Sequence, residues 1–234
     1  MLPFRDLNPT RSAPFVTVLL IAANALAFLY EWSLPRRQLE QFIMAYGVLP
    51  FEITHGVDLA PQIGIPVYLT IVTSMFLHGG WLHILGNMLY LWIFGNNIED
   101  KFGHVRFLLI YLAWGIVAAF AQVVVDPNSR VPAVGASGAI AGVLGAYLVM
   151  FPSARVDSVV FIGIFITTVR TPALFVIGFW IVLQFLNGFL SLGVAHSGDG
   201  VAYFAHIGGA VAGVVVGLVY RALNRPRRMD SYGW

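Results

Sequence analysis

The sequence predicts an all-α fold, a polytopic membrane protein built as a bundle of six transmembrane helices in a single domain over residues 1–234. Hydrophobic residues make up 59% of the chain and charged residues only 10%, whereas soluble domains carry about 25% charged residues. Such a surface must face lipid, where only helices and closed barrels satisfy the backbone. The apolar stretches are long and lack the alternation of barrel strands, which favours helices. The chain has no cysteine, so a disulfide framework and thiolate chemistry are excluded.

A membrane-spanning helix needs about 20 apolar residues, and six segments of the chain fit or approach that length. They cover about 14–33, 80–97, 105–125, 136–151, 172–191 and 203–223. The first is too long for the apolar region of a cleaved signal peptide. The fourth has about 16 residues, which at 1.5 Å each reach about 24 Å of a core near 30 Å. We therefore expect its start to lie below the membrane surface.

Two connecting segments carry apolar residues of their own. Residues 34–79 mix amphipathic and apolar stretches and are too long for a tight turn, so we expect them to lie in the membrane interface. Residues 158–169 are apolar but too short to span, and Arg170 and Pro172 separate them from the fifth helix. We predict a membrane-lying loop there.

The distribution of basic residues predicts the orientation in the membrane. With six spans, both chain ends share one side, and ten arginines and lysines fall on that side. They are Arg5, Arg11, Lys101, Arg106, Arg155, Arg170, Arg221, Arg225, Arg227 and Arg228. Only Arg36, Arg37 and Arg130 fall on the other side. Because cytoplasmic loops carry the excess of basic residues, we expect both termini to be cytoplasmic, in the plasma (inner) membrane.

Polar residues inside the predicted spans are rare and costly, so each suggests a function. His83 and Asn87 are four residues apart and share one face of the second helix. Ser137 begins the fourth helix, and His206 lies near the start of the sixth. All three helices run in the same direction, which brings these groups to one depth below the outer surface. The orphan N–H groups of a buried helix start stabilise an oxyanion, and the site needs a cavity open to the outside.

Glycines predict how Ser137 and His206 meet. The sixth helix repeats glycine every four residues close to the face of His206, and the fourth helix is rich in glycine as well. These residues are Gly209, Gly213, Gly217, Gly138, Gly142 and Gly145. Small residues let two membrane helices approach closely, which would bring the imidazole near the serine hydroxyl.

Each of these residues also has a structural explanation. Ser137 could be a small packing residue, His206 a histidine bonded to a backbone carbonyl, and His83 with Asn87 a pair bonded across helices. A soluble hydrolase elbow would have glycine two places after the serine, where this chain has Ala139.

Other functional classes fit less well. A metal site made by His78, His83 and His206 would lack a nearby carboxylate or thiolate, and a transporter would show broken helices or repeats. Asp199 and His196 belong to an outer loop, where we expect them to be solvated.

Four motifs together carry a family resemblance. They are HGGWLHILGN over 78–87, GNNIEDKFG over 95–103, GASG over 135–138 and AHIGGAVAG over 205–213. In order and spacing the chain resembles the rhomboid intramembrane serine proteases, over about two-thirds of its length. A Trp-Arg pair found in the first loop of some members is absent here.

The resemblance implies a serine endopeptidase with Ser137 as nucleophile and His206 as general base. It implies oxyanion donors from the side chains of Asn87 and His83 and from the Ser137 N–H. Supporting or packing residues would be Gly135, Gly138, His78, Gly209 and Gly213. For the orientation of His206 we consider Tyr147 or Tyr203.

The family's fold is a six-helix bundle whose first loop, here residues 34–79, is half-embedded at its side. The resemblance implies transmembrane-helix substrates cut at a small residue near the outer interface. The movable parts would be the fifth helix, with Trp180 and Phe185 at a lateral gate, and residues 192–202. We expect lipid as a partner, no metal or cofactor and no nucleic acid, while the oligomeric state stays open. The competing functions are a catalytically inactive relative that binds and escorts membrane proteins, and a channel or transporter.

Overall fold

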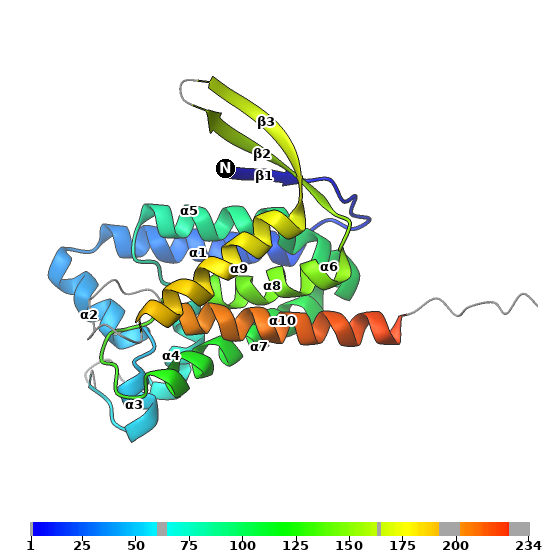
Figure 1. Ribbon diagram of the computed structural model, residues 1–234. Helices are drawn as coiled ribbons and strands as arrows, with labels where there is room; N and C mark the ends of the chain where they lie inside the picture. Colours follow the sequence, from blue (N-terminus) through cyan, green and yellow to red (C-terminus); the bar gives the residue numbers. More distant parts are fainter. Residues whose placement is uncertain (1, 60–64, 163–164, 192–201, 225–234) are drawn as a thin grey trace, which may run out of the picture.

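A computed structural model describes residues 2–59, 65–162, 165–191 and 202–224. Five residues that the sequence assigns to a side of the membrane lie outside the described residues: Asp199, His196, Arg225, Arg227 and Arg228. The described chain forms a helical bundle, and one small sheet projects from it above α5 in the view of Figure 1.

Each of the six apolar segments predicted from the sequence is helical. The helices are α1 (Phe15–Ser33), α5 (Trp81–Tyr90) continued by the π-helical turn η4 (Leu91–Gly95) and α6 (Asn96–Phe102), α7 (His104–Val125), α8 (Ser137–Met150), α9 (Ala173–Ser191) and α10 (Tyr203–Leu223). Among the described residues, α1, α7, α9 and α10 are long and apolar enough to cross a membrane, and Val67–Phe76 with Trp81–Phe102 forms a bent pair that makes a fifth candidate. The prediction of an all-α polytopic membrane protein is confirmed.

Helix α8 is short, as its sequence predicts. Its 14 residues reach about 21 Å at 1.5 Å per residue, less than a hydrocarbon core of about 30 Å. It begins at Ser137, so the bundle surrounds the start of this helix.

The prediction of a membrane-lying loop over residues 158–169 was wrong. Strands β1 (Leu2–Asp6), β2 (Arg155–Ile162) and β3 (Phe165–Pro172) form an antiparallel sheet in the order β1-β2-β3. The segment is rich in valine, isoleucine, threonine and phenylalanine, which favour strands. A lone hairpin is marginally stable, and here the third strand comes from the beginning of the chain. The helical bundle thus carries a small sheet, and Val156 on β2 belongs to the buried core of the bundle.

The described residues of the segment 34–79 fold into short helices and turns. They are α2 (Arg36–Tyr46), α3 (Pro50–His55), the 3-10 turn η2 (Val67–Leu69), α4 (Thr70–Thr73) and the 3-10 turn η3 (Ser74–Phe76). A single bridge between Val48 and Ala133 ties this region to the segment that leads into α8. The region therefore flanks the approach to Ser137.

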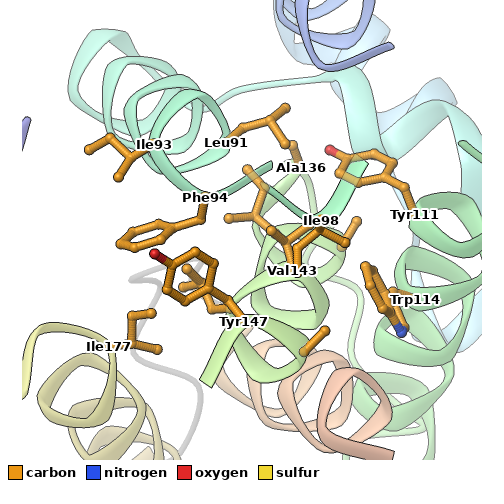
Figure 2. Packing of buried hydrophobic residues seen from close by; sticks show 14 of the residues in the cluster. Leu91, Ile93, Phe94, Ile98, Tyr111, Trp114, Ala136, Val143, Tyr147 and Ile177 are labelled. Atoms are coloured by element: carbon orange, nitrogen blue, oxygen red, sulfur yellow. The ribbon is translucent and has the colours of Figure 1, made fainter. Parts of the chain in front are cut away.

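Helix α8 lies in the middle of the bundle, and every residue from Gly138 to Tyr147 is buried. Figure 2 shows Phe94 and Tyr147 facing each other, with Ile177 approaching from α9. The two aromatic rings meet edge to face at 4.8 Å between centroids. This packing fixes α8 against its neighbours.

Helices α8 and α10 run parallel and touch through glycine. A Cβ atom at Gly209 would overlap the carbonyl oxygen of Gly138, and one at Gly213 would overlap that of Gly142. This backbone contact matches the small-residue packing predicted from the sequence. At the far end, the Arg221 side chain donates to the carbonyl of Val149 at 3.0 Å.

The two described chain ends lie at the same end of the bundle. Asn8, just after β1, donates its amide to the Tyr147 hydroxyl at 2.6 Å, in the last turns of α8. Because α8 starts at Ser137, both β1 and the C-terminal end of α10 lie opposite Ser137.

Candidate active site

Ser137 is the first residue of α8, and the backbone before it is tightly constrained. Gly135 has φ +125°, a conformation that L side chains rarely adopt. Its N–H donates to the carbonyl oxygen of Ser74 at 2.8 Å. The first turn of a helix leaves N–H groups without helical partners, so the backbone around Ser137 offers free donors.

Ser137 and His206 are joined by a hydrogen bond. The distance between Ser137 Oγ and His206 Nε2 is 2.7 Å, and the imidazole is 8% exposed. The other ring nitrogen, Nδ1, lies 2.7 Å from Oε1 of Gln184 on α9. An amide oxygen can only accept, so Nδ1 carries the proton and Nε2 accepts from the serine hydroxyl. The ring of Trp180 packs beside the imidazole at 5.5 Å.

His83 lies on the other side of the Ser137 loop. A Cβ atom at Gly135 would be 2.8 Å from Cε1 and Nε2 of His83 and 3.4 Å from Ser137 Oγ. The Nδ1 atom of His83 accepts the N–H of Gly79 at 3.3 Å. A neutral imidazole with Nδ1 as acceptor carries its proton on Nε2, so His83 presents a donor toward the serine.

Asn87 follows His83 by one helical turn on α5. The side chain is buried, and among the described residues its Nδ2 group has no hydrogen-bond partner. Unpartnered buried donors are costly and uncommon. This amide is therefore free to donate to a ligand.

His78 packs against the ring of His83, and Glu31 accepts a hydrogen bond from the backbone of His78. His78 is 2% exposed, its ring lies 5.1 Å from that of His83, and neither ring nitrogen has a partner among the described residues. The backbone N–H of His78 donates to the buried Glu31 carboxylate at 3.1 Å. Glu31 was not singled out from the sequence, although an acid inside a predicted span is the signal that would have found it.

A cavity of about 40 Å³ lies beside this site. It is bordered by Gly135, Gly138 and Ala205, and by Gln122, whose buried Oε1 has no partner among the described residues. The lining is mainly apolar, and the volume exceeds the roughly 10–15 Å³ that one water needs.

Of the groups predicted to share one depth, Ser137 and His206 are joined by a hydrogen bond, and His83 lies against the loop before Ser137. The prediction for the group that orients His206 was wrong, because Gln184 is that partner. The Tyr147 hydroxyl instead donates to Asp6 at 3.0 Å, at the far end of α8. Gln184 was missed, although a lone glutamine in an apolar helix carries the same signal as Glu31. Among the described residues, no group of three or more histidine, aspartate, glutamate or cysteine residues could hold a metal ion.

Comparison with known proteins identifies the family of the chain. The model of the rhomboid domain matches residues 67–223, more than half of the chain. The chain is similar to rhomboid protease GluP of Bacillus subtilis, with 36% identity over 61% of this chain and 24% of that protein. It is similar to the putative rhomboid protease YdcA of the same organism, with 34% identity over 60% of this chain and 64% of that protein.

A plant relative extends over almost the whole chain. RHOMBOID-like protein 5 of Arabidopsis thaliana is 29% identical over 96% of this chain and 72% of its own length. The chain spans about a quarter of the length of GluP and about two-thirds of that of YdcA. The matched region contains α5, α8, α9 and α10, which carry the polar groups described above. The chain is a multi-pass membrane protein that belongs to the rhomboid family.

Proposed function

We propose that the protein is a serine endopeptidase that cleaves transmembrane segments of other membrane proteins near the outer face of the membrane. The observation that carries this proposal is the 2.7 Å hydrogen bond from Ser137 Oγ to His206 Nε2, with the imidazole oriented from its other side. A nucleophile hydrogen-bonded to an oriented base is the arrangement that nucleophilic catalysis needs. A serine that only packs has no need of an imidazole at this distance.

The reaction proceeds by acyl transfer. Ser137 Oγ attacks the carbonyl carbon of the scissile peptide bond while His206 Nε2 takes the hydroxyl proton. The tetrahedral intermediate collapses, the C–N bond breaks, and His206 gives the proton to the leaving amine. Water then attacks the acyl carbon while His206 Nε2 takes its proton. The C–O bond to Ser137 breaks, His206 returns the proton to Ser137 Oγ, and the carboxylic acid is released. The cavity beside Gly138 is a nearby source of that water.

The oxyanion of the intermediate is stabilised by hydrogen-bond donors around Ser137. The Nε2–H of His83, the Nδ2–H group of Asn87 and the backbone N–H of Ser137 fill this role. The free state of the Asn87 amide supports it, because a donor kept without a partner is ready for charge that develops in the transition state.

The polarity of the bundle supports an orientation with both termini in the cytoplasm of a plasma membrane. The described basic residues Arg5, Arg155, Arg170 and Arg221 lie on elements at the end opposite Ser137. A positive-inside arrangement then turns Ser137 toward the outer face. Substrates would be membrane helices cut at a small residue, entering from the lipid along α9.

The first experiment is labelling of the purified full chain in detergent with a fluorophosphonate probe, which reacts with activated serines. Wild type should be labelled, and Ser137→Ala and His206→Ala should not. Labelling that survives in Ser137→Ala would remove the proposal. An unlabelled wild type, with the probe active on a control membrane hydrolase and the protein folded, would favour an escort module that binds membrane proteins without cutting them. Solute flux in liposomes that persists in Ser137→Ala would indicate a channel.

Asn87→Ala tests the oxyanion site separately. Removing one such donor typically lowers the rate by about 10²–10³, so cleavage should be impaired rather than abolished. The readout is the initial rate of cleavage of a membrane-inserted peptide. Gln38→Ala, which removes an exposed amide on α2, is the control and should keep the wild-type rate. Equal rates for Asn87→Ala and wild type would exclude Asn87 from the oxyanion site.

A further inference from the structure

We propose that Gln184 is a positioning residue that holds His206 in the tautomer required for catalysis, so that the reacting unit is Ser137–His206–Gln184 rather than a serine–histidine pair. The proposal rests on the proposed function, because it assigns Gln184 a task in that reaction. Gln184 acts through His206 and does not touch the substrate.

The tautomer argument follows from hydrogen-bond chemistry. A neutral imidazole has one N–H, and only the nitrogen without it can accept the serine proton. Gln184 Oε1 lies 2.7 Å from Nδ1 and can only accept, so it draws the proton to Nδ1 and leaves Nε2 free to act as base. With the proton on Nε2 instead, His206 would donate to Ser137 and could not accept the hydroxyl proton.

Within the described residues, the imidazole of His206 is hydrogen-bonded to Ser137 on α8 and to Gln184 on α9. Trp180, one helical turn before Gln184, covers the ring but has no acceptor atom. A neutral amide suits this place, because a carboxylate inside the membrane carries a large desolvation cost. Gln184 therefore does for His206 what an aspartate does in water-soluble serine proteases, where it fixes the tautomer.

The place of Gln184 on α9 makes this support conditional. The buried residues of α9 are Ala173, Val176 and Ile177 near its start and Gly188 near its end. Gly188 approaches α10, since a Cβ atom there would lie 3.3 Å from Cβ of Tyr203. Gln184 lies between these two contacts, so His206 has its partner only while α9 is docked on α10.

The test compares Gln184→Leu, Gln184→Glu and wild type with the fluorophosphonate probe. The labelling rate constant at saturating probe reports the chemistry, and the probe concentration at half-saturation reports binding. Gln184→Leu should lower the rate constant about tenfold, the typical worth of one buried hydrogen bond, and leave half-saturation within about twofold, since binding of the probe does not need the tautomer. Gln184→Glu should restore at least half of the wild-type rate constant, because a carboxyl group offers an acceptor oxygen in either protonation state.

Asn187→Leu is the matched control, since it removes an exposed amide one turn further along α9 and should leave both quantities unchanged. If Gln184→Leu does not fold, Gln184→Met supplies an unbranched apolar chain in its place. A wild-type rate constant in the apolar variant, or an equal loss in Gln184→Glu, would show that Gln184 only packs and would overturn the inference. Ser137→Ala separates the two proposals. Labelling that persists in Ser137→Ala would remove the proposed function itself. Labelling that is lost in Ser137→Ala but unchanged in Gln184→Leu would remove only this inference.

Discussion

Helices α8 and α9 both contact α10, and they do so in different ways. The contact between α8 and α10 is backbone against backbone at Gly209 and Gly213. At the contact between α9 and α10, a Cβ atom added at Gly188 would lie 3.3 to 3.6 Å from side-chain atoms of Tyr203, Phe204 and Ile207. Ten consecutive residues of α8 are buried, whereas the middle of α9 has no buried residue.

The difference separates two tasks within one site. The proposed nucleophile and base lie on two helices that pack backbone against backbone, an arrangement that supports a constant Ser137–His206 distance. Gln184, the proposed orienting group, lies on α9, whose middle has no buried residue and whose large side chains Phe175, Phe179 and Phe189 are exposed. In a bilayer these side chains face lipid, the side from which the proposed function brings a substrate helix.

The largest effect is expected from filling the contact between α8 and α10. Gly213→Val would place side-chain atoms on the carbonyl oxygen of Gly142 and force the helices apart. Overpacking costs typically 1–3 kcal/mol and more where backbone must move, so we expect a strongly lowered thermal midpoint in detergent and loss of fluorophosphonate labelling.

The control for Gly213→Val is Gly178→Ala on α9. A Cβ atom there meets only a side-chain atom of Leu174 at 3.9 Å, and alanine is the better helix former by about 1 kcal/mol. Stability and labelling should be kept or slightly raised. A Gly213→Val protein with wild-type labelling would show that the two helices are not held by this contact.

The second-largest effect is expected from cross-linking the contact between α9 and α10. Gly188→Cys with Tyr203→Cys introduces the chain's only two cysteines, at positions whose Cβ atoms would lie 3.3 Å apart, near the usual disulfide spacing of about 3.5–4.5 Å. Oxidation should keep α9 docked, with Gln184 beside His206. We expect labelling by the small probe to stay within about twofold, while cleavage of a membrane-inserted peptide falls at least tenfold and returns on reduction, if substrates enter beside α9.

The reduced double variant is the internal control for the disulfide, because it carries the same substitutions. Equal cleavage in the oxidised and reduced states would show that α9 stays in place during substrate entry. Loss of probe labelling on oxidation alone would show that the cross-link distorts the site.

The sequence predicted the helices because their signal is local. Apolar segments of sufficient length gave five of the six helix positions to within a residue or two, as for Phe15–Ser33 and Tyr203–Leu223. The second helix, predicted to end near residue 97, continues to Phe102 through residues most of which are polar or charged. The contact of Ser137 with His206 was also accessible, since glycines four residues apart on α10 indicate which face packs closely.

The sheet and the partner of His206 depend on contacts that are distant in the chain. Strand β1 pairs Arg5 with Asp157, across more than 150 residues, and no local pattern specifies that pairing. Gln184 and His206 are separated by 22 residues, and which face of α9 turns inward depends on packing that apolar residues on all sides do not encode.

The smallest effect concerns the sheet from which α9 starts. Asp157 on β2 accepts hydrogen bonds from Arg5 on β1 at 3.0 Å and from Arg170 on β3 at 3.1 Å, and both are its cross-strand partners. The bonds from Arg5 and Arg170 hold the pKa of Asp157 below its usual value, which is about 3.9. The sheet therefore gains stability from the charged carboxylate above about pH 4 and loses it as the pH falls through the lowered pKa.

Asp157→Asn removes this contribution, so its sheet should be less protected than that of wild type at pH 7 and equally protected near pH 2. The measurement is hydrogen exchange of β2 and β3 between pH 2 and pH 7, corrected for intrinsic rates. The pKa of Asp6 is raised mainly by burial, which gives the opposite pH dependence, but both proteins contain Asp6 and the difference between them isolates Asp157. Equal protection at pH 7 would mean that Arg5 and Arg170 do not hold the strand before α9 through this carboxylate, and the start of α9 would then depend on the buried residues Ala173, Val176 and Ile177 alone.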